Sequence, residues 1–404
     1  MQRKLKKITG DVLINLFGTG ISLAILQLVI YPLIARIIDA EAYGQMQSII
    51  SVVYMVSGTM GMSLCTTRLV REYEYQEKKE TGDYNRLCLF CILIIIIVLP
   101  LALLVYGKGY DLIDLVLVLA VSVLNFTTNY YAVGFRLKID YKAIFISKII
   151  GAFGYVAGFA CFYFTHKWQF VYLAAFLLET IYYTKHTKLL REPLAFTPII
   201  RETVRTFFNL GAANLLSRSL TYIDKLFLYP VLGGTAVSIY YTANIFGKLI
   251  SMTIEPITNV ILSYLSRESG VPHKVWKRII PAAIAMCVVL YVICILISSP
   301  VIRFFYPQWA DEAIKLVPLT TFCLSVSAFI SIMYPFSLKL IESSKQIVIN
   351  AVGLGTYVAT SFVLANKYAI FGFCLALLIS YLSKMICMLY YCIRIYRTEE
   401  NVTA

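Results

Sequence analysis

Residues 205–266 read RTFFNLGAANLLSRSLTYIDKLFLYPVLGGTAVSIYYTANIFGKLISMTIEPITNVILSYLS. The stretch is apolar enough for two membrane-spanning helices, separated by a turn at Gly233-Gly234. Beyond Arg205 at its start, it nevertheless contains five charged residues: Arg218, Asp224, Lys225, Lys248 and Glu255. A charge at bilayer depth costs about 3 kcal/mol or more, so such residues usually face a bundle interior or a water-filled cavity. They are therefore the first candidates for a functional site.

The composition of the whole chain indicates a membrane protein. Of its 404 residues, 59% are hydrophobic and only 14% are charged, whereas soluble proteins carry about 25% charged residues. A basic N-terminus precedes an apolar run over 12–38. Because a signal-peptide core has only about 7–15 apolar residues, this run predicts a first membrane helix that is retained.

Apolar segments of about 20 residues, the length of a spanning helix, recur along the chain. Twelve are predicted, at 12–38, 42–66, 87–106, 112–135, 143–165, 169–187, 205–232, 235–265, 279–299, 313–337, 346–366 and 369–395. The expected fold is therefore an all-α polytopic membrane protein with twelve transmembrane helices.

The basic residues predict the orientation. The net charge of +14 does not indicate a nucleic-acid partner, because these residues lie in short loops between the apolar segments. On the side of the N-terminus there are 25 Lys and Arg residues, and on the opposite side there are six. Positive residues accumulate on the cytoplasmic side of a membrane, so both termini are predicted to be cytoplasmic.

The chain is predicted to consist of two halves. The longest loops are expected at 68–86, 188–204 and 266–278. The second of these contains Pro193 and Pro198, and it divides the chain into six-helix lobes, 1–195 and 196–404.

Short sequence matches relate the two lobes. The matches are Tyr31-Pro32…Tyr43 with Tyr229-Pro230…Tyr241, at an offset of 198, and Leu99-Pro100…Tyr106 with Ser299-Pro300…Tyr306, at an offset of 200. Because six helices return the chain to its starting side, the lobes would be parallel repeats about an axis along the membrane normal.

Cationic residues lie on one face of each helix in the opening stretch. Arg218 and Lys225 are seven residues apart, about two turns, and Lys248 precedes Glu255 by the same spacing. Such a stripe suits a pyrophosphate, which Arg binds through two hydrogen bonds and Lys binds as a point charge. Arg218, Lys225 and Lys248 are therefore predicted to bind substrate in a cationic cavity. Asp224 and Glu255 are predicted as coupling or gating residues.

Two alternatives to this site remain open. In the first alternative, Asp224 or Glu255 only neutralises a neighbouring cation and stabilises helix packing. In the second, the tyrosines that are candidates for stacking on sugar rings, Tyr54, Tyr222 and Tyr241, belong to an interfacial aromatic belt.

The remaining polar residues predict no catalytic or metal site. The lone CxxC of Cys88 and Cys91 lies in an apolar segment, where Cys acts as a small hydrophobe. The three His residues show no metal-ligand spacing. Sequence spacing gives Glu179 no evident partner, and Lys384 would pair with it only if the two lobes meet there. Lys148 is expected to extend its side chain towards the cytoplasm. Gly154-x-x-x-Gly158 predicts close helix packing.

A charged seventh helix that ends in a small-residue turn resembles the Wzx-type polysaccharide flippases. The residues that carry the resemblance are Tyr222-Ile-Asp224-Lys225…Gly233…Tyr241-Thr-Ala243-Asn244, with Ala42-Tyr43-Gly44 as the counterpart in the first half. The twelve-helix layout matches that family over the whole chain. The family belongs to the MOP superfamily, together with the MATE drug antiporters and the lipid II flippases.

The resemblance implies a transporter in a bacterial inner membrane. Its cargo would be an undecaprenyl-pyrophosphate-linked oligosaccharide, which is moved by alternating access of two lobes arranged in a V. It implies no cofactor, and an H⁺ or Na⁺ gradient is the expected energy source. Membrane lipid, a polysaccharide polymerase and chain-length proteins are the implied partners.

Two other functions fit the sequence less well. A MATE-like antiporter for organic cations should have an acidic cavity, but the five charges of the opening stretch sum to +1. A membrane glycosyl polymerase or transferase should carry a sizeable outer loop with catalytic carboxylates, and none is predicted.

The predicted orientation can be tested by thiol labelling. In a variant that lacks the ten native cysteines, Gln2→Cys should be protected from a membrane-impermeant thiol reagent in intact cells, and Gly234→Cys should react. Labelling at residue 2 but not at residue 234 would overturn the topology.

Overall fold

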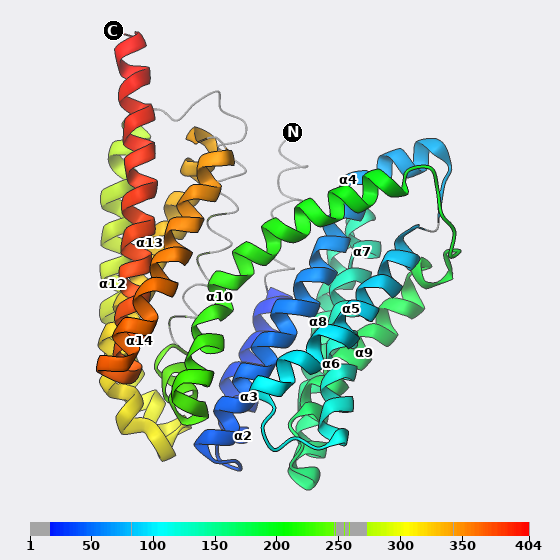
Figure 1. The fold of residues 1–404 in the computed structure, drawn as a ribbon, viewed down its shortest axis with the longest axis horizontal. Coiled ribbons are helices and arrows are strands. Elements are labelled where there is room, and N and C mark those ends of the chain that lie inside the picture. The colour runs from blue at the N-terminus through cyan, green and yellow to red at the C-terminus, as the bar shows by residue number, and fades with distance from the viewer. Residues whose placement is uncertain are drawn as a thin grey trace. The chain divides into compact units, whose positions relative to one another are not determined.

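The computed structural model describes residues 17–81, 83–245, 247, 254, 258, 273–341 and 343–403, and in these ranges the chain is helical without strands (Figure 1). It divides into two compact units, Met1–Leu226 and Phe227–Ala404. The first unit contains η1 (Ile25–Ile30), α2 (Tyr31–Ala35), α3 (Ala40–Val53), η2 (Tyr54–Gly58), α4 (Thr59–Lys78), α5 (Asp83–Tyr106), α6 (Leu112–Tyr131), α7 (Val133–Leu137), α8 (Tyr141–Thr165), α9 (Gln169–His186) and η3 (Leu189–Arg191).

The remaining helices are α10 (Ile200–Ala243), which passes from the first unit into the second, then α12 (His273–Phe305), η4 (Pro307–Trp309), α13 (Ala310–Leu340) and α14 (Ser343–Thr403). In the second unit, α13 packs against both α12 and α14, and the three lie side by side in Figure 1. The predicted lobe boundary at 195/196 concerns an internal repeat that these units do not test, so it stays a prediction.

Two backbone breaks divide long helices where the sequence predicted turns. Gly233 has φ +81° inside α10, as the predicted turn at Gly233-Gly234 requires, and glycine adopts this conformation at little cost. Ala369 has φ +48° inside α14, and it is the first residue of the predicted segment 369–395. Both α10 and α14 therefore consist of two helices each.

The predicted loop at 68–86 is wrong. The helix that starts at Ala40 continues through η2 to Lys78 and ends where Lys79 adopts left-handed backbone angles. The prediction used the length of the apolar run alone. Residues 67–78 are mostly good helix formers, and charged side chains among them form ion pairs with residues beyond the helix.

Nine helices of the described chain are long and apolar enough to span a membrane. The shortfall from twelve has identifiable causes. The two helices of α14 count as one candidate, α9 is not among the nine, and the predicted segment 235–265 is described mainly up to Ala243. Twelve crossings therefore stays a prediction.

The pair α8 and α9 packs with backbones in close approach. A Cβ at Gly154 would lie 2.4 Å from Ala175 Cα, and one at Gly158 would lie 2.4 Å from the carbonyl oxygen of Phe170. The close packing expected from these two glycines is confirmed, because no larger residue fits at either position.

The same pair holds a buried ion pair that the sequence analysis missed. Lys148 Nζ donates to Glu179 Oε2 at 2.8 Å, and the side chain of Glu179 is only 3% exposed. Glu179 therefore pairs with Lys148 rather than with Lys384, and Lys148 does not simply extend to the membrane surface. The two residues lie on different helices, so sequence spacing could not pair them.

Gly154 offers a test of this packing. Gly154→Ala should destabilise the protein by about 1–3 kcal/mol, because the added methyl must displace backbone of α9. Gly355→Ala is the matched control, since a Cβ there meets nothing within 4 Å, and it should be neutral or slightly stabilising. The check is the apparent unfolding temperature in detergent. Equal effects at the two positions would contradict the predicted contact.

Candidate functional site

The first half of α10 belongs to the first unit, because polar groups along this half form hydrogen bonds with other helices of that unit. Asn214 Nδ2 donates to Ser63 Oγ of α4 at 3.0 Å, and the Tyr106 hydroxyl of α5 donates to the carbonyl oxygen of Leu226 at 2.8 Å. Its charged stretch therefore packs against the interior face of this unit.

Arg218 lies beside a π-helical segment in the long helix Ala40–Lys78. A Cβ at Gly58, the last residue of η2, would lie 3.2 Å from Arg218 Nη1 and 3.4 Å from Asn125 Nδ2. The missing side chain at Gly58 therefore makes room for the guanidinium. Single π-helical turns frequently occur at functional sites.

Amide and hydroxyl groups of α6 and η2 adjoin this space. Asn125 Nδ2 donates to Ser57 Oγ at 2.9 Å, and Asn129 Nδ2 donates to Asn125 Oδ1 at 3.1 Å. Arg218 is half-buried, and no carboxylate of the described residues forms an ion pair with it. The site thus presents hydrogen-bond donors that suit an anion or a sugar hydroxyl.

An aromatic pair adjoins the guanidinium. Tyr54, the first residue of η2, stacks on Tyr222 with ring centroids 6.3 Å apart and planes inclined by 23°. Lys225 Nζ lies 5.5 Å from the centroid of the Tyr222 ring. Behind them, the hydroxyls of Tyr31 and Tyr172 form a hydrogen bond. We call Tyr54, Gly58, Asn125, Arg218 and Tyr222 the Arg218 site.

The other predicted site residues have different surroundings. Lys225 is 3% exposed, and Asp224 is half-buried, with Oδ1 accepting from the Lys225 backbone N–H. Tyr241 belongs to the second unit and is buried. Lys248 and Glu255 lie outside the described residues. The structure therefore brings Arg218, Tyr222, Lys225 and Tyr54 together, and the roles of all these residues stay predictions.

The sequence analysis missed Asn125, Asn129, Ser57 and Gly58. Asn residues inside the otherwise apolar segment 112–135 were the available signal, since buried amides need partners. The π-helical turn carries no known sequence signature, so its position was accessible only from the structure.

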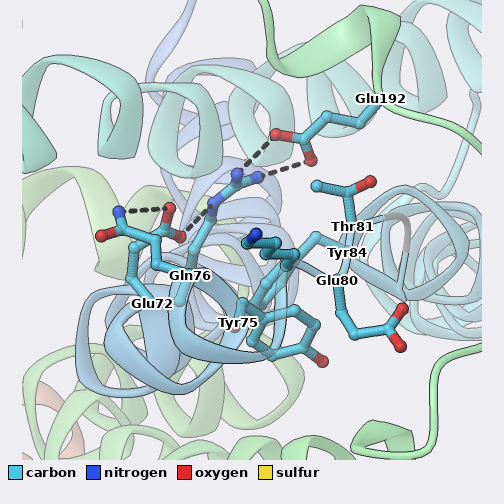
Figure 2. Close-up of a pocket in the computed structure, with 9 residues that line it drawn as sticks. Glu72, Tyr75, Gln76, Glu80, Thr81, Tyr84 and Glu192 are labelled. Atoms are coloured by element: carbon cyan, nitrogen blue, oxygen red, sulfur yellow. Dashed lines mark hydrogen bonds and ion pairs between the residues drawn. The ribbon is translucent and has the colours of Figure 1, made fainter.

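A second polar cluster fastens the start of α10 and the preceding linker to the first unit. We define the Arg68 cluster as Arg68, Arg71, Asp83, Glu192 and Glu202. Arg68 binds Glu192 through both terminal nitrogens, at 2.9 and 2.5 Å, and also donates to Glu72 at 3.2 Å. Figure 2 shows Glu192 and Glu72 around the small pocket, about 180 Å³, that these side chains line.

The other members extend the cluster to α5 and α10. The buried carboxylate of Asp83 accepts from the hydroxyls of Tyr75 and Thr197 and from the Thr197 backbone N–H. Arg71 donates to Glu202 at 2.7 Å. This hydrogen bond, more than the charge of Arg71 itself, lowers the pKa of the Glu202 carboxyl. The linker is therefore part of the folded first unit.

Removing Arg68 should therefore weaken the whole unit. Arg68→Ala should destabilise the protein by about 1–3 kcal/mol, because it leaves the half-buried carboxylate of Glu192 without its cation. Lys78→Ala, an exposed change on the same helix, should stay within about 0.5 kcal/mol of the parent. Unfolding temperatures in detergent measure both, and a harmless Arg68→Ala would show that the cluster does not hold the linker.

Comparison with known proteins places the chain in a family. The model of the family described as "Polysaccharide biosynthesis protein" matches residues 9–269. No curated protein matches the chain.

Solved transporters share its fold. The lipid II flippase MurJ, in an inward closed conformation, has a TM-score of 0.67 at 13% identity and covers 95% of this chain and 86% of its own. A multidrug resistance MATE family transporter of the MOP superfamily, inward-facing, has a TM-score of 0.65 at 15% identity, with 96% of both chains covered. A mutant of a Vibrio cholerae MATE transporter scores 0.59 at 15% identity and covers 96% and 95%.

The resemblance noted in the sequence is thus confirmed at the level of the family. The model matches well over half of the chain, and the fold likeness extends over nearly all of it. The chain belongs to the polysaccharide biosynthesis protein family, and it has the multi-pass helical fold that a MATE family transporter and the lipid II flippase MurJ share.

Proposed function

We propose that this protein is a flippase that moves an undecaprenyl-pyrophosphate-linked oligosaccharide across a bacterial inner membrane. The family supports a polysaccharide cargo, and the fold is shared with a lipid II flippase. The single observation that carries the proposal is Arg218, a half-buried cation in the membrane domain without a carboxylate partner among the described residues. A charge at bilayer depth is costly unless it is paired or hydrated, and an anionic ligand would supply the counter-charge.

The geometry of the Arg218 site suggests how the cargo head would bind. The guanidinium would take two oxygens of the pyrophosphate, with Lys225 and Lys248 as further positive charges. The second N–H of Asn125 and the amide oxygen of Asn129 would bind sugar hydroxyls. Tyr54 and Tyr222 now stack on each other, and separation of the two rings would expose their faces to a sugar. No covalent step is needed.

Transport would proceed by alternating access in a twelve-helix protein with both termini cytoplasmic. Because the Arg68 cluster and the Arg218 site attach α10 to the first unit as far as Leu226, the linker at 188–204 is a poor hinge. Pro230 and the break at Gly233 lie directly after this attached part, and helices bend at such residues. We place the moving boundary at 226–233. Asp224 and Glu255 are the candidates for coupling to H⁺ or Na⁺.

A MATE-like antiporter for organic cations is the second candidate, because several MATE structures share the fold. It would need an unpaired carboxylate facing the cavity. Within the membrane helices of the described first unit, the carboxylate of Glu179 is neutralised by Lys148, and that of Asp224 accepts from the Lys225 backbone N–H. Arg218 forms no ion pair with a described carboxylate. The charge pattern therefore favours an anionic cargo.

Substitution of Arg218 tests the proposal. In a strain without the native gene, Arg218→Ala should express normally and abolish surface glycan, because no buried carboxylate of the described residues loses its partner. Arg218→Lys should restore glycan only in part, since a point charge replaces a two-pronged donor. Lys138→Ala, at an exposed position, is the control.

Two outcomes count against the mechanism. Loss of expression in Arg218→Ala would indicate a structural ion pair. Full surface glycan in Arg218→Ala and Lys248→Ala, singly and together, would exclude the cationic site.

A further inference from the structure

A large apolar groove lies on the first unit, away from the Arg218 site. It has a volume of about 640 Å³ and runs between the first turns of α5 and the first turns of α10, with the linker along one side. Its lining includes large apolar side chains that are 45–70% exposed: Leu89, Phe90, Leu194, Phe196 and Phe208. This volume lies in the range of ligand pockets, about 300–1,000 Å³.

The groove continues into a surface suited to lipid. Further along α5 from Leu89 and Phe90, the side chains of Leu93, Ile96 and Ile97 are exposed. This helix has the most apolar composition among the candidate membrane spans. An exposed apolar face of this kind belongs in the acyl region of a bilayer. The occupant of the groove should therefore be a lipid chain rather than a protein.

Positive side chains adjoin the groove. Arg86 lines it, with its guanidinium carbon 3.7 Å from the Phe196 ring centroid and with Nε and Nη2 donating to the carbonyl oxygen of Leu194. Nη1 has no hydrogen bond to the residues that the structure describes, so Arg86 keeps a donor for a ligand.

The start of α10 has the pattern of a helix at a membrane surface. Ile200 and Val204 line the groove, and Arg201 and Arg205, each one residue further along, are exposed. A spacing of four residues aligns each pair along the helix. A basic row beside an apolar row is typical of interfacial helices, and basic pockets on the cytoplasmic side of membrane proteins bind anionic head groups.

We propose that this groove binds an anionic phospholipid of the cytoplasmic leaflet. One acyl chain lies in the groove, and the phosphate lies among Arg86, Arg201 and Arg205. Because Leu194 and Phe196 of the linker form part of the lining, the lipid joins the linker and the start of α10 to α5. The proposal does not depend on the cargo, and it makes the attachment of α10 sensitive to the lipid composition of the membrane.

Native mass spectrometry of the full-length protein in detergent tests this site. Dioleoyl phosphatidylglycerol should bind at least ten-fold more tightly than dioleoyl phosphatidylcholine. The double variant Arg201→Gln/Arg205→Gln should lose this preference, because both side chains are exposed and supply only charge. Leu89→Trp, which fills the groove from an exposed position, should weaken binding of both lipids. The charge-matched control Lys138→Gln/Lys142→Gln, also exposed with the same spacing, should behave as the parent.

Several results would overturn the proposal. Equal affinity for the two lipids, or unchanged binding in the double variant, would remove the phosphate site. Equal binding of dihexanoyl and dioleoyl phosphatidylglycerol would show that no acyl chain occupies the groove. Displacement of phosphatidylglycerol by an equal concentration of undecaprenyl phosphate would assign the groove to the lipid of the cargo.

Discussion

The cost of burying a charge without a counter-charge is the constraint on which this structure depends. In the first unit, several charges beside the core pair with partners far apart in the sequence, as Lys148 does with Glu179 and Arg68 does with Glu192. Such pairs contribute little net stability, but breaking one leaves a stranded charge. They therefore act as positional restraints between helices. Arg218 departs from this pattern within the described residues, and the proposed function depends on that departure.

The attachment of α10 follows from the same restraints. Ion pairs at its start, hydrogen bonds along its length and the Tyr54–Tyr222 stack make the first part of this helix a component of the N-terminal unit. Loop length and proline content in the sequence place the boundary between the two halves in the linker 188–204. The two compact units of the structure instead divide after Leu226. This difference matters for the proposed alternating access, because a hinge lies where few contacts cross it.

The candidate site could be predicted only in part. Arg218, Lys225 and Tyr222 were found because charge and aromatic residues stand out in an apolar stretch. Asn125 and Gly58 were not, because an amide and a glycine in a membrane helix have many possible roles. Their importance comes from contacts between separate helices, because Gly58 adjoins both Asn125 and Arg218, which lie far from it in the chain. Helical periodicity relates residues within one helix and carries no information about which helix lies opposite.

The sequence by itself determined that this is an all-helical membrane protein, where its main helices lie, and that the chain turns at Gly233. These features depend on local properties: the length of apolar runs, and the freedom of glycine to adopt a positive φ. Only the tertiary structure decided that α4 continues to Lys78, that Glu179 pairs with Lys148, and that a π-helical turn opens space for Arg218. Each of these depends on side chains from separate helices meeting in a medium of low dielectric constant, where an unpaired polar group is costly. That cost is set by the packed neighbours of a residue, which its position in the sequence does not specify.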